Sequence, residues 1–297
     1  TDLVINTAKS GIEIRGKQSS RPDKIEIEGT GSGPVITVEA DQSFEIRGVT
    51  IKGGTTGILA MTDSEVEIRR CMFDGISGIS VNCLDPTSVY IAGSVITASG
   101  SDAIRIDQGG KVNVLQCTLL NNTGLGVNAL DGEAHIVATL IHDSGAGIDG
   151  TPATLEVLGN WVTDVGGIPQ AMPTGVTDAN AVTDVLVPAT VFETVIDPFP
   201  GKLVSVTEER LSGVDTGELE ADPFSMPFTG LDFDAESRST GNLVVGADDA
   251  DGLAVAAAWT ECFVIQSGFP RAYVGEGVIT IEINAPADKV WAAIGNF

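Results

Sequence analysis

The sequence predicts an all-β chain that is built as a parallel solenoid. Six eight-residue segments between residues 44 and 162 recur with steps of 22, 23, 23, 22 and 21 residues. Apolar residues occupy positions 1, 3 and 8 of each segment, and alternation with a period of two indicates a strand rather than a helix. A fixed period of this length is typical of repeat proteins. Such strands bury their apolar faces by stacking coil upon coil.

The repeat contains two sets of strands in alternation. The long segments are Phe44–Ile51, Val66–Phe73, Val89–Ile96, Val112–Leu119, Ala134–Ile141 and Leu155–Val162, and their sixth residues form a predicted ladder of Val49, Cys71, Ser94, Cys117, Thr139 and Asn160. The short segments are Gly57–Ala60, Gly78–Val81, Ala103–Ile106, Gly124–Val127 and Gly147–Gly150. Turns rich in Gly, Asp, Asn and Ser separate the two sets. Each unit is therefore strand, turn, strand and loop.

These paired strands, Gly-Ile-x-Val and Val-x-Ile-x-x-Cys/Asn/Ser-x-Ile/Leu, resemble those of the right-handed parallel β-helix family, which includes pectate lyases and phage tailspikes. The resemblance covers residues 11–167. It implies an all-β, right-handed parallel β-helix with a short C-terminal β-rich cap. Because lyases, hydrolases, adhesins and virion components share this coil, the fold alone does not select a function.

Four regions follow one another along the chain. Residues 1–43 are expected to form N-terminal capping coils, since terminal repeats cover exposed strand edges. Residues 44–167 form the regular coils, and residues 168–252 irregular final coils and loops. Within the latter, Asp222–Phe224, Leu231–Arg238 and Val244–Asp248 are similar to the closing segment of secreted and phage β-helix proteins. Residues 253–297 are expected to cap the solenoid or to contact a neighbouring subunit.

The composition is strongly acidic. Asp and Glu number 41 against 16 Lys and Arg, which gives a formal net charge of −25. Nucleic acid is excluded as a partner because phosphate binding needs a basic surface. Membrane insertion is not expected, since the longest apolar stretch, Leu253–Trp259, is too short to span a bilayer. The acidic excess is consistent with solubility in a salty or extracellular setting, or with binding of a divalent cation.

The cysteines do not identify the compartment. Cys71 and Cys117 occupy the same ladder position two coils apart, so their Cα atoms should lie about 9–10 Å apart. This separation is too large for a disulfide, and both residues are expected to be small buried hydrophobes. Cys83 and Cys262 can pair only if the C-terminal region folds back on the solenoid.

Charged residues on the outer side of the strands are candidates for chemistry. Lyases of the family that this chain resembles use carboxylates to hold Ca²⁺ and an Arg or Lys as the base. Glu45 and Glu67 are expected to stack at position 2, and Arg47 and Arg69 at position 4. This pattern is also what a pair of surface charge ladders produces. For a lyase, Arg69 is one candidate base, and Arg105 is the other.

Two further sets of polar residues recur from coil to coil. Asn82, Asp107 and Asn128 each follow a short strand, where Asn and Asp commonly satisfy turn backbone groups. The best candidate Ca²⁺ ligands are the turn carboxylates Asp74, Asp143 and Asp164.

The histidines and aromatic residues indicate neither a metal site nor a sugar-binding groove. The two histidines, His135 and His142, lie seven residues apart without a metal-ligand pattern. Tyr90 is the one aromatic residue expected to face outward on the repeat, which argues against a long polysaccharide groove within one chain.

Two functions remain open on the sequence. The first is a non-catalytic structural or adhesive β-helix on a virion or extracellular surface, such as a phage decoration or tailspike-like protein. Its expected partners are virion or cell-surface proteins and surface glycans, and a homotrimer is compatible with the fold. The alternative is a Ca²⁺-dependent polysaccharide lyase that acts on acidic glycans. The first is preferred, because a fold without a clustered site does not indicate an enzyme.

Overall fold

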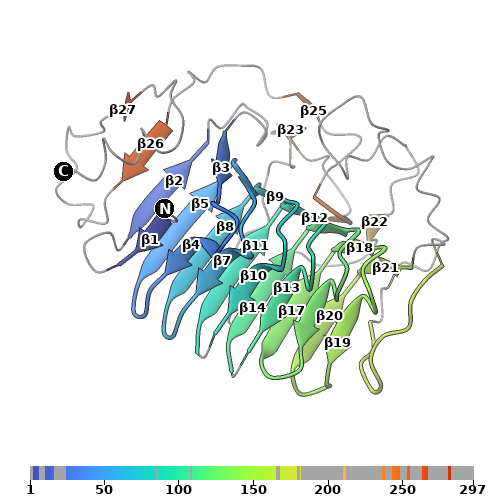
Figure 1. Cartoon of the computed structure of the whole chain (residues 1–297). Coiled ribbons are helices and arrows are strands. Elements are labelled where there is room, and N and C mark those ends of the chain that lie inside the picture. Colours follow the sequence, from blue (N-terminus) through green and yellow to red (C-terminus); the bar gives the residue numbers. More distant parts are fainter. Residues whose placement is uncertain are drawn as a thin grey trace, which may run out of the picture.

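The structure of the protein is a computed structural model. It describes residues 3–6, 11–16, 25–84, 86–107, 109–164, 168–178, 181 and 245–247, together with the backbone of six short strands between residues 210 and 281. Most described residues belong to three parallel sheets that run along an elongated stack of coils (Figure 1).

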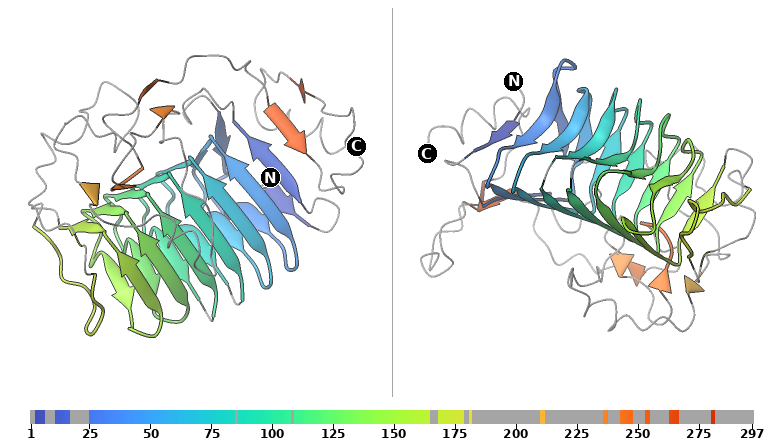
Figure 2. Two further views of the ribbon diagram at one scale, coloured as in Figure 1. Left: turned by 180° about the vertical axis from the view of Figure 1, so that it is seen from behind. Right: turned by 90° about the horizontal axis from the view of Figure 1, so that it is seen from below.

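The chain visits the three sheets in turn, one strand in each sheet per coil. Sheet A contains β1 (Leu3–Ile5), β4 (Pro34–Val38), β7 (Thr56–Ala60), β10 (Ile79–Cys83), β13 (Ile104–Ile106), β16 (Val127–Ala129) and β19 (Ile148–Gly150). Sheet B contains β2 (Ile12–Arg15), β5 (Ser43–Arg47), β8 (Glu65–Arg69), β11 (Ser88–Ala92), β14 (Lys111–Leu115), β17 (Glu133–Val137) and β20 (Leu155–Leu158). Sheet C contains β3 (Glu26–Glu28), β6 (Thr50–Lys52), β9 (Met72–Asp74), β12 (Val95–Thr97), β15 (Thr118–Leu120), β18 (Leu140–His142) and β21 (Trp161–Thr163). This arrangement confirms the predicted all-β parallel solenoid, and its successive coils lie side by side in both views of Figure 2.

Each long sequence segment forms two strands rather than one. A coil therefore has three strands, whereas the sequence predicts two. A corner at the fifth residue separates the sheet B strand from the sheet C strand. At this corner the backbone has a positive φ in every regular coil, at Gly48, Arg70, Gly93, Gln116, Ala138 and Gly159. Glycine adopts this conformation at low steric cost, but half of these corners carry another residue type. The sequence therefore gave an incomplete signal of the corner.

The short segments pair in a register that differs by two residues from the sequence alignment. Ile58 pairs with Val81 rather than with Ile79, and Ile104 pairs with Val127. A shift of two residues leaves every side chain on the same face of the sheet, because the strand period is two. The prediction of which side chains face inward and which face outward is therefore correct, but the predicted pairing partners in the adjacent coils are not.

The interior consists of stacked apolar columns, one or two from each sheet. Phe73 is among the largest fully buried side chains, and it lies between Ile51 and Ile96 in the inner column of sheet C. The predicted ladder occupies the corner between sheets B and C, and all six of its residues are completely buried. The side chains of its polar members accept hydrogen bonds from the main chain of the preceding coil: Asn160 Oδ1, for example, accepts from Thr139 N over 2.9 Å.

Segments from later in the chain lie against both ends of the stack. At the N-terminal end, β26 (Phe263–Gln266) pairs antiparallel with β2, and β27 (Thr280–Ile281) pairs with β26. At the other end, residues 168–178 cross the last coil, with Met172 and Val176 packed against the core. The Asp178 carboxylate accepts hydrogen bonds from Gly159 N at 2.6 Å and Asn160 N at 2.9 Å. Covering the edges in this way prevents further strand pairing.

A returning segment lies on the outer face of sheet C. Gly246 N donates to Ala138 O over 2.8 Å, Ala247 N donates to Thr118 Oγ1 over 2.9 Å, and Ala247 packs against Met72 and Val95. These residues belong to the Val244–Asp248 motif, and its described residues Gly246 and Ala247 lie against the coils. The remaining short strands pair as β22 (Arg210–Leu211) with β24 (Leu243–Val244) and β23 (Glu236–Ser237) with β25 (Leu253–Ala254).

The described cysteines, Cys71, Cys83 and Cys117, are buried, as expected for the first and third. Burial raises the pKa of the Cys71 thiol to about 12, so this thiol is protonated at neutral pH. Cys262, with which Cys83 could pair if the C-terminal region folds back, lies outside the described residues. Over the described part of the chain, no helix has the length and hydrophobicity needed to cross a membrane.

Candidate functional site

The most concentrated group of charges lies on the outer face of sheet B. Because side chains alternate along a strand, the second and fourth residues of each long segment point away from the core. The first outer column contains Glu13, Glu45, Glu67, Tyr90, Asn113, His135 and Glu156. The second contains Arg15, Arg47, Arg69, Ala92, Leu115, Val137 and Leu158.

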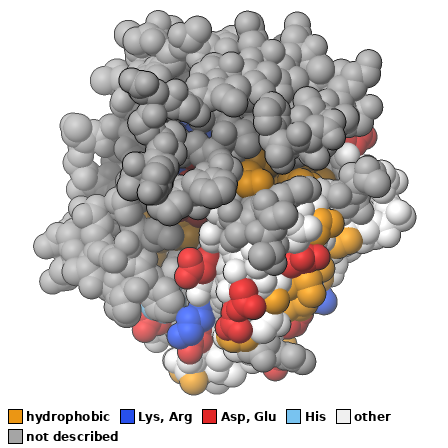
Figure 3. Space-filling view, turned by 90° about the vertical axis from the view of Figure 1, so that its left-hand side faces the viewer, with side chains coloured by type: hydrophobic (Ala, Val, Ile, Leu, Met, Phe, Trp, Pro, Cys, Tyr) orange, Lys and Arg blue, Asp and Glu red, His pale blue; other side chains and the backbone are white. Residues whose placement is uncertain are grey.

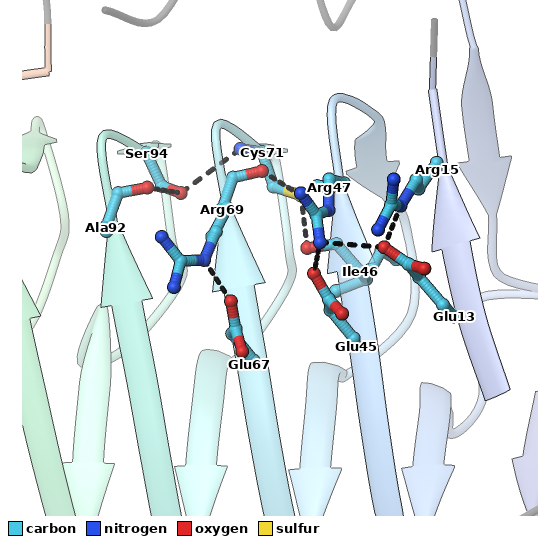
Figure 4. Close-up of polar contacts among 10 residues, drawn as sticks. All are labelled: Glu13, Arg15, Glu45, Ile46, Arg47, Glu67, Arg69, Cys71, Ala92 and Ser94. Atoms are coloured by element: carbon cyan, nitrogen blue, oxygen red, sulfur yellow. Dashed lines mark hydrogen bonds and ion pairs between the residues drawn. The ribbon is translucent and has the colours of Figure 1, made fainter. Parts of the chain in front are cut away.

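The Glu–Arg pairs form a ladder of stacked pairs on three successive coils (Figure 4). Each arginine contacts the glutamate two residues earlier on its own strand, as in the Arg69–Glu67 pair. Arg47 also reaches across to the neighbouring coil, where its Nη2 atom lies 2.8 Å from Glu13 Oε1. The expected stacking of Glu45 with Glu67 and of Arg47 with Arg69 is therefore present. Sequence analysis missed the additional pair from β2, Glu13 and Arg15, because its spacing from the next segment is irregular.

The ladder is balanced in charge and partly buried. The Glu13 side chain is only 7% exposed. Burial lowers the pKa of Arg47 to about 10, and the neighbouring positive charges of Arg15 and Arg69 act in the same direction. A pKa near 10 leaves Arg47 protonated at neutral pH, which does not suit it for the role of a general base. On the end of the molecule that faces the viewer in Figure 3, acidic groups are spread over the described surface, and the clearest basic group lies directly beside acidic ones.

Tyr90 continues the ladder, but it is not an exposed aromatic platform. The Arg69 guanidinium carbon lies 5.0 Å from the centre of the Tyr90 ring, as in a cation–π contact. Tyr90 is only 2% exposed, and burial raises the pKa of its hydroxyl. Tyr90 thus points outward on sheet B as expected, but its ring is not available to stack on a sugar.

The second candidate base, Arg105, lies on sheet A and is held by a buried aspartate. Arg105 Nε and Nη2 lie 2.8 Å and 2.7 Å from Asp102 Oδ2. Asp102 also accepts hydrogen bonds from Leu125 N and Asn128 Nδ2. Sequence analysis missed Asp102, although an aspartate three residues before an arginine at the start of a strand is a detectable signal. The structure does not bring Arg69 and Arg105 together, because they stand on different sheets.

The polar column on sheet A differs from the predicted one because of the two-residue register shift. Asn82 pairs with Arg105, and Arg105 pairs with Asn128. Asp107 follows β13, two residues beyond Arg105, and is not a member of this column. The neighbour of Asn128 in the next coil is Asp149. The column therefore presents amide, guanidinium and carboxylate groups in succession, each partly exposed.

The three predicted Ca²⁺ ligands are not neighbours. Asp143 and Asp164 follow β18 and β21, which lie in adjacent coils. Asp74 is the last residue of β9, three coils away from β18. Because adjacent coils are about 4.8 Å apart, Asp74 cannot share one ion with the other two. Among the described residues, no group of three or more His, Cys, Asp or Glu side chains could hold a metal ion.

The two histidines have different surroundings. His135 lies in the outer column of sheet B, and its Nδ1 atom is 3.0 Å from Glu156 Oε2. His142 is buried at the end of β18, where its Nδ1 atom is 2.7 Å from Thr163 Oγ1. Burial lowers the pKa of His142, and the nearby Asp143 and Asp164 oppose this effect only in part.

This lowered pKa predicts a loss of stability in mild acid. A histidine of the unfolded chain titrates near pH 6.5, whereas folded His142 takes up a proton only at lower pH. The unfolded state therefore binds more protons, and the free energy of unfolding falls as the pH drops below about 6.5 towards the pKa of the folded state. Urea unfolding at pH 7.5 and 5.5 measures this fall, which His142→Gln should reduce. An unchanged pH dependence in this variant would contradict the assignment.

Comparison with known proteins gives one match, and it lies over the coils. Residues 34–172 match the family model described as "Right handed beta helix region". No curated protein and no solved structure matches the chain significantly. The matched residues span every coil from β4 to β21, so the match to this model and the described coils agree.

Proposed function

We propose, from the premise that this chain belongs to the right-handed β-helix superfamily, that it is a non-catalytic structural or adhesive protein of a virion or extracellular surface. In this role the solenoid is a rigid scaffold, and its outer faces contact virion proteins, cell-surface proteins or surface glycans. A phage decoration or tailspike-like protein fits this description, and such a scaffold can assemble as a homotrimer.

The observation that carries this proposal is the separation of the candidate catalytic groups. A lyase needs a base beside the α-proton of a uronate, and carboxylates that converge on a cation. Arg69 is engaged by Glu67 and Tyr90 on sheet B, while Arg105 is engaged by Asp102 on sheet A. Each arginine thus has local partners that hold it in place, as expected of structural charge pairs.

The outer faces also differ in how accessible they are. From β12 onward the outer residues of sheet C are buried, and Val95 and Leu140 have no exposed surface. On sheet A, the corresponding residues Leu59, Asn82 and Arg105 are partly exposed. A partner protein or glycan would therefore find sheet A more accessible than sheet C. The net charge of −25 favours an uncharged or basic partner surface, or a setting in which salt screens the repulsion.

An assay for lyase activity tests the proposal against its alternative. The protein is incubated with polygalacturonate or alginate in the presence of Ca²⁺, and the ultraviolet absorbance of unsaturated products is followed. We expect no increase over a heat-denatured control. Product that disappears in Arg69→Ala or Arg105→Ala would overturn the structural role in favour of a lyase.

The location is tested separately. The protein is purified from its natural source, and its sedimentation is compared with that of the isolated chain. Sedimentation with particles or cell envelopes, together with labelling of their outer surface by antibodies, supports the proposal. Recovery only as a free protein from the cell interior contradicts it.

A further inference from the structure

One corner of the solenoid carries a tripeptide that the charge ladders and the fold leave unexplained. Asn121-Asn122-Thr123 is the single Asn-x-Ser/Thr sequence in the chain whose middle residue is not proline. It directly follows β15, at the corner that leads from sheet C back to sheet A. Such a tripeptide is the acceptor sequence for N-linked glycans when it lies on an accessible surface of an exported protein.

The corner exposes the two residues that the acceptor sequence needs. Asn122 is buried, where its Oδ1 atom accepts a hydrogen bond from Ser99 N at 3.0 Å and its Nδ2 atom donates to Ser144 Oγ at 3.1 Å. Because Asn122 points inward, Asn121 and Thr123 on either side of it point to solvent, and both are exposed.

The main chain of this corner is fixed while the acceptor side chain is open. Asn121 N donates to His142 O over 3.0 Å, and Thr123 N donates to Ser99 O over 2.9 Å. Asn121 has a φ of 52°, a left-handed conformation that asparagine tolerates better than most residues. Among the contacts of the described residues, none involves the side-chain polar atoms of Asn121 or Thr123. The carboxamide nitrogen is therefore available for reaction.

The neighbouring coils leave room for a bulky group. The residue equivalent to Asn121 in the preceding coil is Ala98, and those equivalent to Thr123 in the adjacent coils are Gly100 and Gly145, all of them exposed. These small residues flank Thr123 on both sides and Asn121 on the side of the preceding coil, while the equivalent of Asn121 in the next coil is the half-buried Asp143. A sugar attached to Asn121 would project away from the solenoid without meeting a large side chain from these positions.

We propose that Asn121 is the attachment site of an N-linked glycan. In the transfer step, Asn121 Nδ2 attacks the anomeric carbon of an oligosaccharide that is carried on a polyprenyl phosphate or diphosphate. The bond from that carbon to the phosphate oxygen breaks, a carbon–Nδ2 bond forms, and the amide proton passes to a base of the transferase. The lipid phosphate is the leaving group. The proposal rests on the extracellular part of the proposed location, because the transferase acts on exported chains.

The acceptor is tested with the full chain fused to a secretion signal and produced in glycosylating cells. The secreted protein is digested, and mass spectrometry of the peptide that contains residue 121 is carried out before and after treatment with a peptide-N-glycosidase in ¹⁸O-water. We expect a glycopeptide that converts to ¹⁸O-labelled aspartate at residue 121. Thr123→Ser should keep the glycan, whereas Thr123→Ala and Asn121→Asp should lose it. Aspartate is tolerated at this corner, since Asp143 occupies the equivalent position with a φ of 50°.

Two outcomes distinguish a wrong attachment site from a wrong location of the protein. An unmodified Asn121 peptide from folded, secreted wild-type protein would overturn the attachment site. The protein from its natural source is then analysed in the same way, and a glycan at residue 121 supports both proposals. If only the natural protein is unmodified, the proposed surface location is overturned, while the chemical competence of the site stands.

Discussion

Replacing Phe73 with alanine should lower the free energy of unfolding by about 3–5 kcal/mol, the usual cost of removing a buried phenylalanine side chain. Phe73 has no exposed surface and lies in the inner column of sheet C between Ile51 and Ile96. The main chain on both sides is held by parallel pairing, so the coil cannot collapse into the space left behind. The cost therefore includes both the lost burial and the cavity.

Urea unfolding at neutral pH measures this loss. Ile96→Val is the matched control, because it removes one methylene from the next position of the same column and should cost only about 0.5–1.5 kcal/mol. A loss of less than about 1 kcal/mol for Phe73→Ala would mean that the column repacks, and that the solenoid interior is less rigid than its register suggests.

The position of Phe73 illustrates what the sequence predicts well. Inward residues follow a period of two within a strand and a period near 22 residues between coils, and both rules depend only on local alternation and stacking. Phe73 was placed in the core on this basis. The corner at Arg70 was not predicted, because its left-handed backbone is imposed by the closure of the coil and not by the residue type. Only half of the equivalent corners carry glycine.

The candidate site was predicted less completely, for two physical reasons. The pairing of Asn82 with Arg105 depends on loop lengths, and loops of unequal length hid a two-residue shift that leaves the faces unchanged. The burial of the outer face of sheet C depends on a segment more than a hundred residues away, since Ala247 packs against Met72 and Val95. The periodicity of the coils does not reveal that a distant segment covers this face.

The internal polar ladder links the sequence pattern to the stability of the last coil. Its members Ser94, Thr139 and Asn160 are polar but completely buried, which is tolerable only if each finds a partner. Asn160 is the last member. It accepts from Thr139 N over 2.9 Å, and its Nδ2 atom donates to Ile136 O over 2.8 Å and to Asp178 Oδ2 over 3.0 Å. Asn160 therefore joins the preceding coil to the segment that covers the end of the solenoid.

Asn160→Leu should accordingly be among the most damaging substitutions. The variant keeps a similar side-chain volume, but it removes the side-chain partner of Thr139 N and of Ile136 O. Each buried group that is left unsatisfied costs about 1–3 kcal/mol, so the expected loss is about 2–6 kcal/mol. Asn160→Thr should lose less, because a threonine hydroxyl at this ladder position can still accept from the preceding coil, as Thr139 Oγ1 does from Cys117 N over 3.4 Å.

Hydrogen exchange distinguishes this local effect from general destabilisation. In Asn160→Leu, the amides of Thr139 and of β21 should exchange faster than those of β8 and β11, which lie several coils away, because each coil contacts mainly its neighbours. Asp178→Ala removes the partner at the open end of the ladder, where water can replace a partly exposed carboxylate, and should have a smaller effect in the same direction. Equal protection of Thr139 in Asn160→Leu and in the wild type would refute the role assigned to Asn160, since the ladder would then not depend on the hydrogen bonds of its last member.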